Sequence, residues 1–162
     1  MPRTNRTLHR LPLWLAALAL AAPAVAQERV AQLSRVSGTV TITRAADGAV
    51  TEARQLGPRV QNGSVFPFDV VATAAGASAL LLFGDGSEVE LKAETSLTVR
   101  EVDLSALVSA GKRDRPLGRT IRVLAGDVLA NVVPNPEIAT EFETPSGVAA
   151  VKGTELSISV AR

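Results

Sequence analysis

The sequence predicts an all-β domain of about ten to twelve short strands, arranged as a two-layer sandwich or as a short, twisted, β-solenoid-like stack. Apolar residues after position 26 recur mostly at a spacing of two, and many of them are β-branched. Glycine and proline interrupt these runs at short intervals. No stretch of this part keeps a helical spacing long enough for a helix, so the one helix we expect is an N-terminal signal peptide.

The first 26 residues have the pattern of an export signal. Three arginines and no acid precede the apolar run 11–22, which ends at Pro23 and the small residues of Ala24-Val25-Ala26. A membrane-spanning helix needs about 20 apolar residues, more than this run offers, although an uncleaved anchor stays open as an alternative. We therefore expect cleavage after Ala26 and a periplasmic or secreted protein, with no membrane insertion once the signal is removed.

Composition excludes many kinds of chemistry after residue 26. This part contains no histidine, cysteine, tyrosine, tryptophan or methionine. Nucleophile systems built on histidine or cysteine, zinc sites built on imidazole or thiolate, and disulfides are therefore excluded, and we expect no metal or cofactor. Cleavage removes three arginines, leaving 14 basic residues against 16 acidic ones, so the charge gives no reason to expect nucleic-acid binding.

The first predicted strands are short. Residues 30–36 and 39–43 alternate apolar and polar side chains on either side of Gly38, and residues 50–54 return as a hairpin. Residues 65–71 resume a strand, in which Pro67 indicates an edge position or a bulge.

Residues 77–92 give a strong hairpin signal, because an Asp-Gly turn separates two extended runs. A two-residue loop would bury Glu88 and Glu90, whereas a three-residue loop pairs Leu81 with Val89 and leaves both glutamates outside. We expect the three-residue loop, since two buried carboxylates without a cation are strongly unfavourable.

The second half of the chain continues the strand pattern after one interruption. Residues 95–102 alternate, whereas residues 103–119 predict a surface loop insertion with one helical turn at 104–108. Residues 120–133 then predict a strand-glycine-strand unit around Gly126, followed by strands at 138–143 and 155–160. The predicted organisation is a signal peptide at 1–26 and a β domain at 27–162.

Three blocks of the sequence resemble the FecR-type domain, named after the periplasmic part of a ferric-citrate regulator. Residues 144–156 read Thr-Pro-Ser-Gly-Val-Ala-Ala-Val-Lys-Gly-Thr-Glu-Leu, residues 79–91 contain the Phe-Gly-Asp-Gly-Ser hairpin, and residues 122–128 match a strand-Gly-Asp-strand unit. Together they cover about 36–160 in the family's order. The motif positions that we expect to maintain the fold are Asp85, Gly86, Gly126, Thr144, Pro145, Lys152, Gly153, Thr154 and Glu155.

The resemblance has departures. Lys152 stands where the family usually has arginine, and lysine lacks the planar guanidinium that holds carboxylates with two hydrogen bonds. Full-length regulators of the family resemble anti-sigma factors, with a cytoplasmic segment and a transmembrane helix, whereas we expect here a stand-alone exported domain. The anti-sigma role is therefore not carried over, and the family offers no catalytic residues to transfer.

Two groups of residues are candidates for contact with a partner. Leu80 and Leu82 lie on the strand face opposite the core residue Leu81, so either another sheet layer covers them or they form an exposed apolar patch. The basic run that contains Lys112, Arg113 and Arg115 either contacts an acidic partner or is a solvated loop.

We expect a non-enzymatic binding or signalling module of the bacterial envelope, with another envelope protein or a cell-wall polymer as its partner. The main alternative is a structural envelope component that self-associates through sheet edges, and the oligomeric state is left open. A distant alternative is a glycan hydrolase built on carboxylates alone, with Asp85, Glu88 and Glu90 as the nearest acidic cluster. The same cluster lacks the ligand count of a calcium loop.

Overall fold

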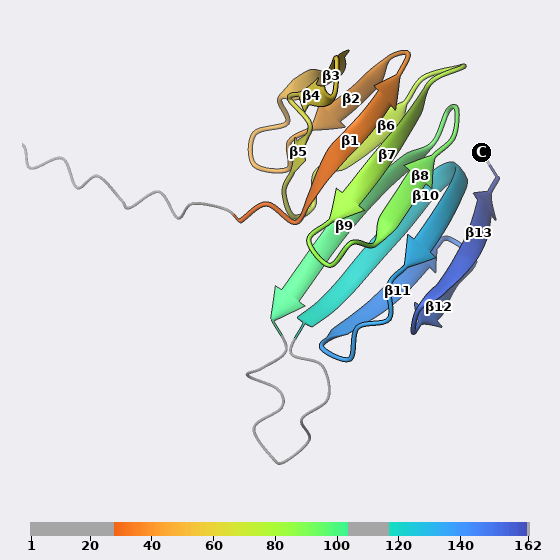
Figure 1. The fold of residues 1–162 in the computed structure, drawn as a ribbon. Helices are drawn as coiled ribbons and strands as arrows, with labels where there is room; N and C mark the ends of the chain where they lie inside the picture. Colours follow the sequence, from red (N-terminus) through yellow and green to blue (C-terminus); the bar gives the residue numbers. More distant parts are fainter. Residues whose placement is uncertain (1–27, 104–116, 162) are drawn as a thin grey trace, which may run out of the picture.

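A computed structural model describes residues 28–103 and 117–161, and in this part the chain is entirely β (Figure 1). The predicted fold class is confirmed, with thirteen strands in the described ranges. The predicted signal helix, its cleavage site and the helical turn at 104–108 lie outside the described residues. The strands are β1 (Ala31–Ser37), β2 (Val40–Thr43), β3 (Val50–Leu56), β4 (Arg59–Gln61), β5 (Ser64–Val65), β6 (Val70–Thr73), β7 (Ser78–Phe83), β8 (Glu88–Leu91), β9 (Ser96–Asp103), β10 (Leu117–Val132), β11 (Ile138–Thr144), β12 (Gly147–Val151) and β13 (Thr154–Val160).

The strands form one hydrogen-bonded path that curls over into two layers. Its order is β4-β3-β2-β6-β9-β10-β8-β7-β1-β5, with β11 and β13 branching from β10 and β12 pairing with β11. We call the layer of β1, β5, β7, β8 and β13 layer one, and the layer of β2, β3, β6, β9, β11 and β12 layer two. The end of the path returns on its start, because β1 also contacts β3 and β4.

Strand β10 belongs to both layers. Its first half pairs with β9 and β11, and its second half pairs with β8 and β13. The register shifts between Val123 and Ala125, and Gly126 follows with a φ of 88°. A Cβ at this glycine would lie 2.4 Å from Oγ1 of Thr95, so only glycine allows the strand to bend here against its neighbour.

The core lies between the layers and is built from the inward side chains of each strand. Leu33, Leu81 and Val89 come from layer one, and Val40 and Leu97 come from layer two, all with an exposed fraction of 0%. The alternation that predicted the strands therefore also selected the buried face, as expected for strands with one solvated side.

Four elements differ from the sequence-based prediction: one strand is broken, two strands were not predicted, and one loop is shorter. The predicted strand 65–71 is broken, because Pro67 and Phe68 form a turn between β5 and β6. Strands β4 and β12 were not predicted, since both are short and lack an alternating pattern. The predicted loop 103–119 is shorter, because β9 extends to Asp103 and β10 begins at Leu117.

Within 28–103 and 117–161, the chain has no helix of the length and hydrophobicity that a membrane crossing requires.

Candidate functional site

The β7–β8 hairpin has the predicted three-residue loop. Leu81 pairs with Val89, Leu82 with Glu88 and Leu80 with Glu90. Both glutamates therefore point outward with the two leucines, and the register predicted from the cost of burying carboxylates is confirmed.

No further layer of described residues covers Leu80 and Leu82. Leu82 is 38% exposed and Leu80 is half-buried, on the outer face of layer one. Of the two alternatives left open by the sequence, burial under another layer is wrong for these side chains. Whether they contact a partner stays a prediction.

Neighbouring strands extend this outer face. Leu80 and Glu90 lie in one cross-strand row with Leu129 of β10, which is 43% exposed. Glu88 lies in the next row with Asn131 and with Glu155 of β13. We call the surface formed by Leu80, Leu82, Leu129, Glu88, Glu90 and Glu155 the acidic leucine face.

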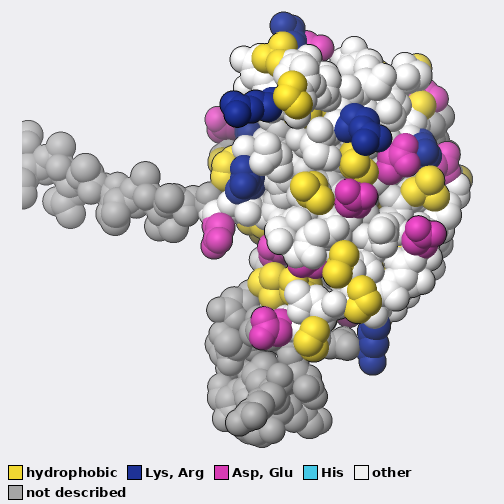
Figure 2. Space-filling view, viewed as in Figure 1, with side chains coloured by type: hydrophobic (Ala, Val, Ile, Leu, Met, Phe, Trp, Pro, Cys, Tyr) yellow, Lys and Arg dark blue, Asp and Glu magenta, His cyan; other side chains and the backbone are white. Residues whose placement is uncertain are grey.

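The acidic leucine face is hollowed and carries an excess of negative charge. A shallow groove of about 450 Å³ runs between Leu80, Leu129 and the side chains of Glu88, Glu90 and Glu155. Figure 2, which views the molecule from the side of β1, β7 and β8, shows hydrophobic and acidic side chains interleaved here. The outward side chains of layer one include four carboxylates, since Asp127 adds to the three glutamates, against the two cations Arg35 and Lys92.

The groove carboxylates differ in their partners. Lys92 donates from Nζ to Oε1 of Glu90 at 2.7 Å, and both side chains are about 40% exposed. The side-chain carboxylates of Glu88 and Glu155 have no hydrogen-bond or ion-pair partner among the described residues. An incoming cation therefore meets carboxylates that are still free to pair.

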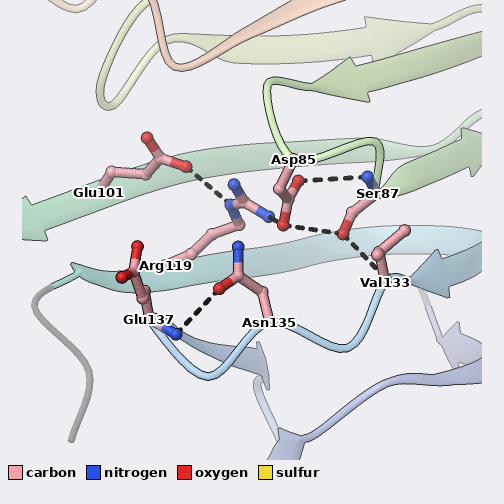
Figure 3. A network of polar contacts seen from close by, with 7 residues as sticks. All are labelled: Asp85, Ser87, Glu101, Arg119, Val133, Asn135 and Glu137. Carbon is pink, nitrogen blue, oxygen red and sulfur yellow. Dashed lines mark hydrogen bonds and ion pairs between the residues drawn. The ribbon is translucent and has the colours of Figure 1, made fainter.

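Asp85 does not belong to this face. Its carboxylate turns inward and accepts a hydrogen bond from Nη1 of Arg119 at 2.9 Å, with side-chain exposures of 5% and 2% (Figure 3). Arg119 also donates from Nε to Glu101 at 2.7 Å, and its guanidinium lies 4.1 Å above the ring of Phe83. The acidic cluster considered from sequence is therefore split, because Asp85 faces the interior while Glu88 and Glu90 face solvent.

Ser87 extends this network to the end of β10. Its amide and hydroxyl donate to Asp85 at 3.1 and 3.0 Å, and its oxygen accepts a hydrogen bond from the amide of Val133 at 3.0 Å (Figure 3). Burial alone would raise the pKa of Asp85, but the hydrogen bond and charge of Arg119, with the two bonds from Ser87, hold it below its ordinary value of 3.8. The Asp-Gly-Ser turn therefore fastens the β7–β8 hairpin to both halves of β10, which fixes the acidic leucine face.

A family model described as FecR protein matches residues 69–162. The chain belongs to the FecR family. The recognition from three sequence blocks is confirmed, although the match starts at Asp69, so β1–β5 of this FecR-family chain lie outside it. No curated protein and no solved structure was found to match the chain.

The FecR motif at 144–156 forms the hairpin of β11 with β12 and the passage from layer two to β13. Thr144 accepts hydrogen bonds from the amides of Ser146 and Gly147, which closes the turn at Pro145. At the passage, Gly153 has a φ of 98°, and a Cβ there would lie 2.4 Å from Cγ of Pro134. The glycine is therefore required by close packing.

The remaining motif residues lie at the surface. Lys152, which replaces the family's usual arginine, is exposed and has no ion-pair partner among the described residues. Thr154 is exposed as well, and Glu155 projects onto the acidic leucine face. Gly86 takes a φ of 84° in the hairpin turn, as such a turn requires.

The sequence analysis missed Arg119 and placed it in the surface loop. Its placement of Lys112, Arg113 and Arg115 in the same loop stays a prediction, because these residues lie outside the described part of the chain. A signal for Arg119 was present. Arg119 lies two residues before Ile121 and four before Val123, so its side chain points to the same side of the strand as theirs. Because both of these side chains point inward, extending the alternation by two residues places the arginine inside as well. An inward arginine needs carboxylates, and Asp85 and Glu101 supply them.

Proposed function

We propose that this FecR-family protein is an exported, non-enzymatic binding or signalling module of the bacterial envelope. In this proposal its acidic leucine face recognises a basic, partly apolar segment of another envelope protein. The observation that carries the proposal is an uncovered groove lined by Leu80 and Leu129, with Leu82 exposed on the same face. The carboxylates of Glu88 and Glu155 in this groove have no partner among the described residues. Exposed apolar side chains gathered in one place are typical of interaction sites.

Charge decides which partner suits this face. The four carboxylates exceed the two cations, so a basic segment gains attraction at long range while an acidic one is repelled. The leucines then supply the apolar contact area. A segment that alternates basic and apolar side chains fits both properties of the groove.

Export is supported by the sequence of the first 26 residues. A basic start, a short apolar run and Ala24-Val25-Ala26 form a signal-peptide pattern. The proposed module therefore works outside the cytoplasm, where its partner is an envelope protein.

The proposal of a non-enzymatic role rests on how the groove carboxylates are held. Retaining and inverting glycosidases need one carboxylic acid that stays protonated near neutral pH, which burial in an apolar pocket provides. Here Glu90 is paired with Lys92 and is 40% exposed, and Glu88 and Glu155 lie on an open face. A test on soluble cell-wall fragments should give no release of reducing ends, and release that Glu88→Gln abolishes would contradict the proposal.

Self-association through sheet edges is a second candidate, favoured by one observation. Among the described strands, β13 pairs only with β10 and β12 pairs only with β11, so each has one edge that no described strand pairs with (Figure 1). Free edges are templates for pairing with another chain. Size-exclusion chromatography over a range of concentrations separates the candidates, because a concentration-independent monomer contradicts self-association.

The central experiment compares the protein purified after export with a Leu80→Glu, Leu82→Glu double variant. The probe is an immobilised synthetic peptide of alternating lysine and leucine, with a glutamate-leucine peptide as the charge control. We expect binding of the wild type to the lysine peptide only, weakened by salt. The double variant is compared at high salt, where the attraction of its two added carboxylates is screened, and there it should lose about tenfold or more because the leucine contacts are gone.

The matched control is a Val50→Glu, Val148→Glu variant, because both valines are about two-thirds exposed on strands of layer two. It adds the same charge away from the groove and should bind like the wild type. The same three proteins then serve as baits in an envelope extract, with bound proteins identified by mass spectrometry. Equal capture by all three would refute the assignment of the acidic leucine face.

A further inference from the structure

An exposed phenylalanine stands on the other layer in an unusual backbone conformation. Phe68 is 56% exposed, and its φ of 68° lies in the left-handed region, which side-chain-bearing residues rarely adopt. Because this ring is exposed, it adds little apolar burial to the core, and its backbone conformation costs free energy. Such strain is concentrated at functional sites.

The turn that presents Phe68 is rigidly held. Asp69 is buried and its carboxylate accepts hydrogen bonds from the amides of Ala45 and Phe66, at 3.0 Å each, and from Arg44 at 2.5 Å. The amide of Phe68 itself donates to the carbonyl of Val99 at 2.8 Å. The backbone that carries the ring is therefore held in place before any ligand arrives, which reduces the entropy lost on binding.

Beside this ring lies a small pocket of about 120 Å³ on the outer face of layer two. It is lined by Phe68, Thr98, Arg100, Thr120, Arg122 and Glu143. The side chains come from β9, β10 and β11, whose cross-strand register places Thr98 next to Arg122 and Arg100 next to Thr120. The pocket is thus separate from the acidic leucine face, which belongs to layer one.

The polar groups of this pocket are incompletely satisfied. Arg122 is occupied, because its Nε and Nη2 contact Oε2 of Glu143 at 2.8 and 2.7 Å. Arg100 donates only to the hydroxyl of Thr120, at 3.3 Å, and has no acidic partner among the described residues. Oγ1 of Thr98 is buried and has no hydrogen-bond partner within residues 28–103 and 117–161. A buried hydroxyl without a partner is unusual and costs stability.

We propose that this pocket binds a sugar that carries a carboxylate. The sugar ring packs on the exposed face of Phe68, and its carboxylate pairs with the guanidinium of Arg100. Hydroxyl groups of the ring donate hydrogen bonds to Glu143, whereas the buried Oγ1 of Thr98 lies out of reach of the ligand. The pocket of about 120 Å³ takes only part of one sugar unit, and the rest of the unit and of a glycan chain extends into solvent.

The chemistry of the lining favours this ligand over simpler ones. A neutral sugar leaves Arg100 without a counter-charge, and an inorganic anion leaves the ring of Phe68 uncovered. Glu143 does not repel the ligand's carboxylate strongly, since Arg122 already neutralises it. A mixed lining of aromatic, guanidinium and hydroxyl groups therefore corresponds to a ring with both hydroxyls and one acid group.

The test is an NMR titration of the ¹⁵N-labelled protein, because a small open pocket binds a single sugar weakly. N-acetylmuramic acid and N-acetylglucosamine are the first probes, since they share one ring and differ in the lactyl carboxylate. Glucuronate and glucose form a second pair, in which the carboxylate is on the ring itself. We expect saturable shifts at the amides of Phe68, Arg100 and Thr120 with an acidic member, and which pair responds identifies the source of the carboxylate.

Three variants test the roles of the lining residues. Phe68→Gly removes the ring and also the strain of the left-handed backbone, so it should weaken binding about tenfold while the melting temperature stays equal or rises. Arg100→Gln should remove the preference for the acidic member of each pair. Thr98→Val should leave the fold as stable as the wild type or more stable, because the hydroxyl has no partner to lose, and it should bind the sugars like the wild type, because the buried hydroxyl does not reach the ligand.

Two outcomes would overturn the proposal. One is the absence of saturable shifts with both acidic probes, and the other is equal affinity for the acidic and neutral members of a pair. The Leu80→Glu, Leu82→Glu variant is the control for independence and should bind the sugars like the wild type. The proposal of a sugar site and the proposal that the acidic leucine face binds a protein can therefore be refuted independently of each other.

Discussion

Replacing Arg119 by methionine tests whether the ion-paired network maintains the fold. The substitution removes the cation but keeps an unbranched side chain of similar length over Phe83. It leaves two carboxylates, Asp85 and Glu101, whose side chains are only 5% and 17% exposed, without their partner. Breaking a buried pair in this way costs about 3–5 kcal/mol, so we expect the free energy of unfolding at pH 7 to fall by that amount.

The pH dependence of this loss distinguishes a charge effect from a packing effect. In the wild type the pKa of Asp85 is lower in the folded than in the unfolded state, so its stabilisation is present above about pH 3.8 and is lost as the pH falls through the lowered value. Without Arg119, burial raises the pKa of this carboxyl instead. The variant's deficit should therefore shrink between pH 7 and pH 4, because protonation removes the unpaired charge.

The assay is urea unfolding followed by far-UV circular dichroism, since no tryptophan or tyrosine follows residue 26. Arg122→Met is the matched control on the same strand. Its guanidinium is 59% exposed and pairs with Glu143 at the surface, so the loss should stay within about 1 kcal/mol. The reasoning fails if the two variants lose equal stability at pH 7, or if the deficit of Arg119→Met is the same at pH 4 and pH 7.

Three more predictions, based on five substitutions, have clear expected outcomes. Gly126→Ala should destabilise by several kcal/mol in urea unfolding, whereas Gly48→Ala, where a Cβ meets open space, should cost about 1–2 kcal/mol; similar losses would argue against the bend in β10. Leu81→Glu should abolish the cooperative transition while Leu82→Glu melts within a few degrees of the wild type, and the reverse order would refute the hairpin register. Asp69→Asn should lower stability by about 1–3 kcal/mol by circular dichroism, because Asp69 closes the turn before β6; an unchanged midpoint would contradict this.

Much of the fold was predictable because the information is local. Alternation with a period of two selects both the strand and its buried face, so Leu81 and Val89 point inward and Glu88 and Glu90 outward. The Asp-Gly turn fixed the position of the hairpin, and the cost of buried carboxylates fixed its loop length. Strands β4 and β12 escaped prediction because short edge strands are formed by their partners rather than by their own pattern.

The sites were less predictable, since they combine residues from distant strands. The sequence indicated Leu80 and Leu82, but Leu129 and Glu155 join them only through the pairing of β10 with β8 and β13. The pocket beside Phe68 likewise joins β9, β10 and β11. Pro67 marked the bend before this phenylalanine, but nothing in the order of residues indicated the left-handed backbone at Phe68.

By itself, the sequence determined the all-β class, the inward face of most strands and the FecR resemblance, because alternation and motifs are properties of residues that are close in the chain. Its composition also determined that thiol and imidazole chemistry is absent after residue 26. Tertiary structure alone decided that Arg119 is buried between Asp85 and Glu101 and that no described layer covers Leu80 and Leu82. It also decided that the hydroxyl of Thr98 is left without a partner among the residues that the structure describes. These are relations across strands. They depend on how β10 bends between the two layers, and that bend sets which side chains meet.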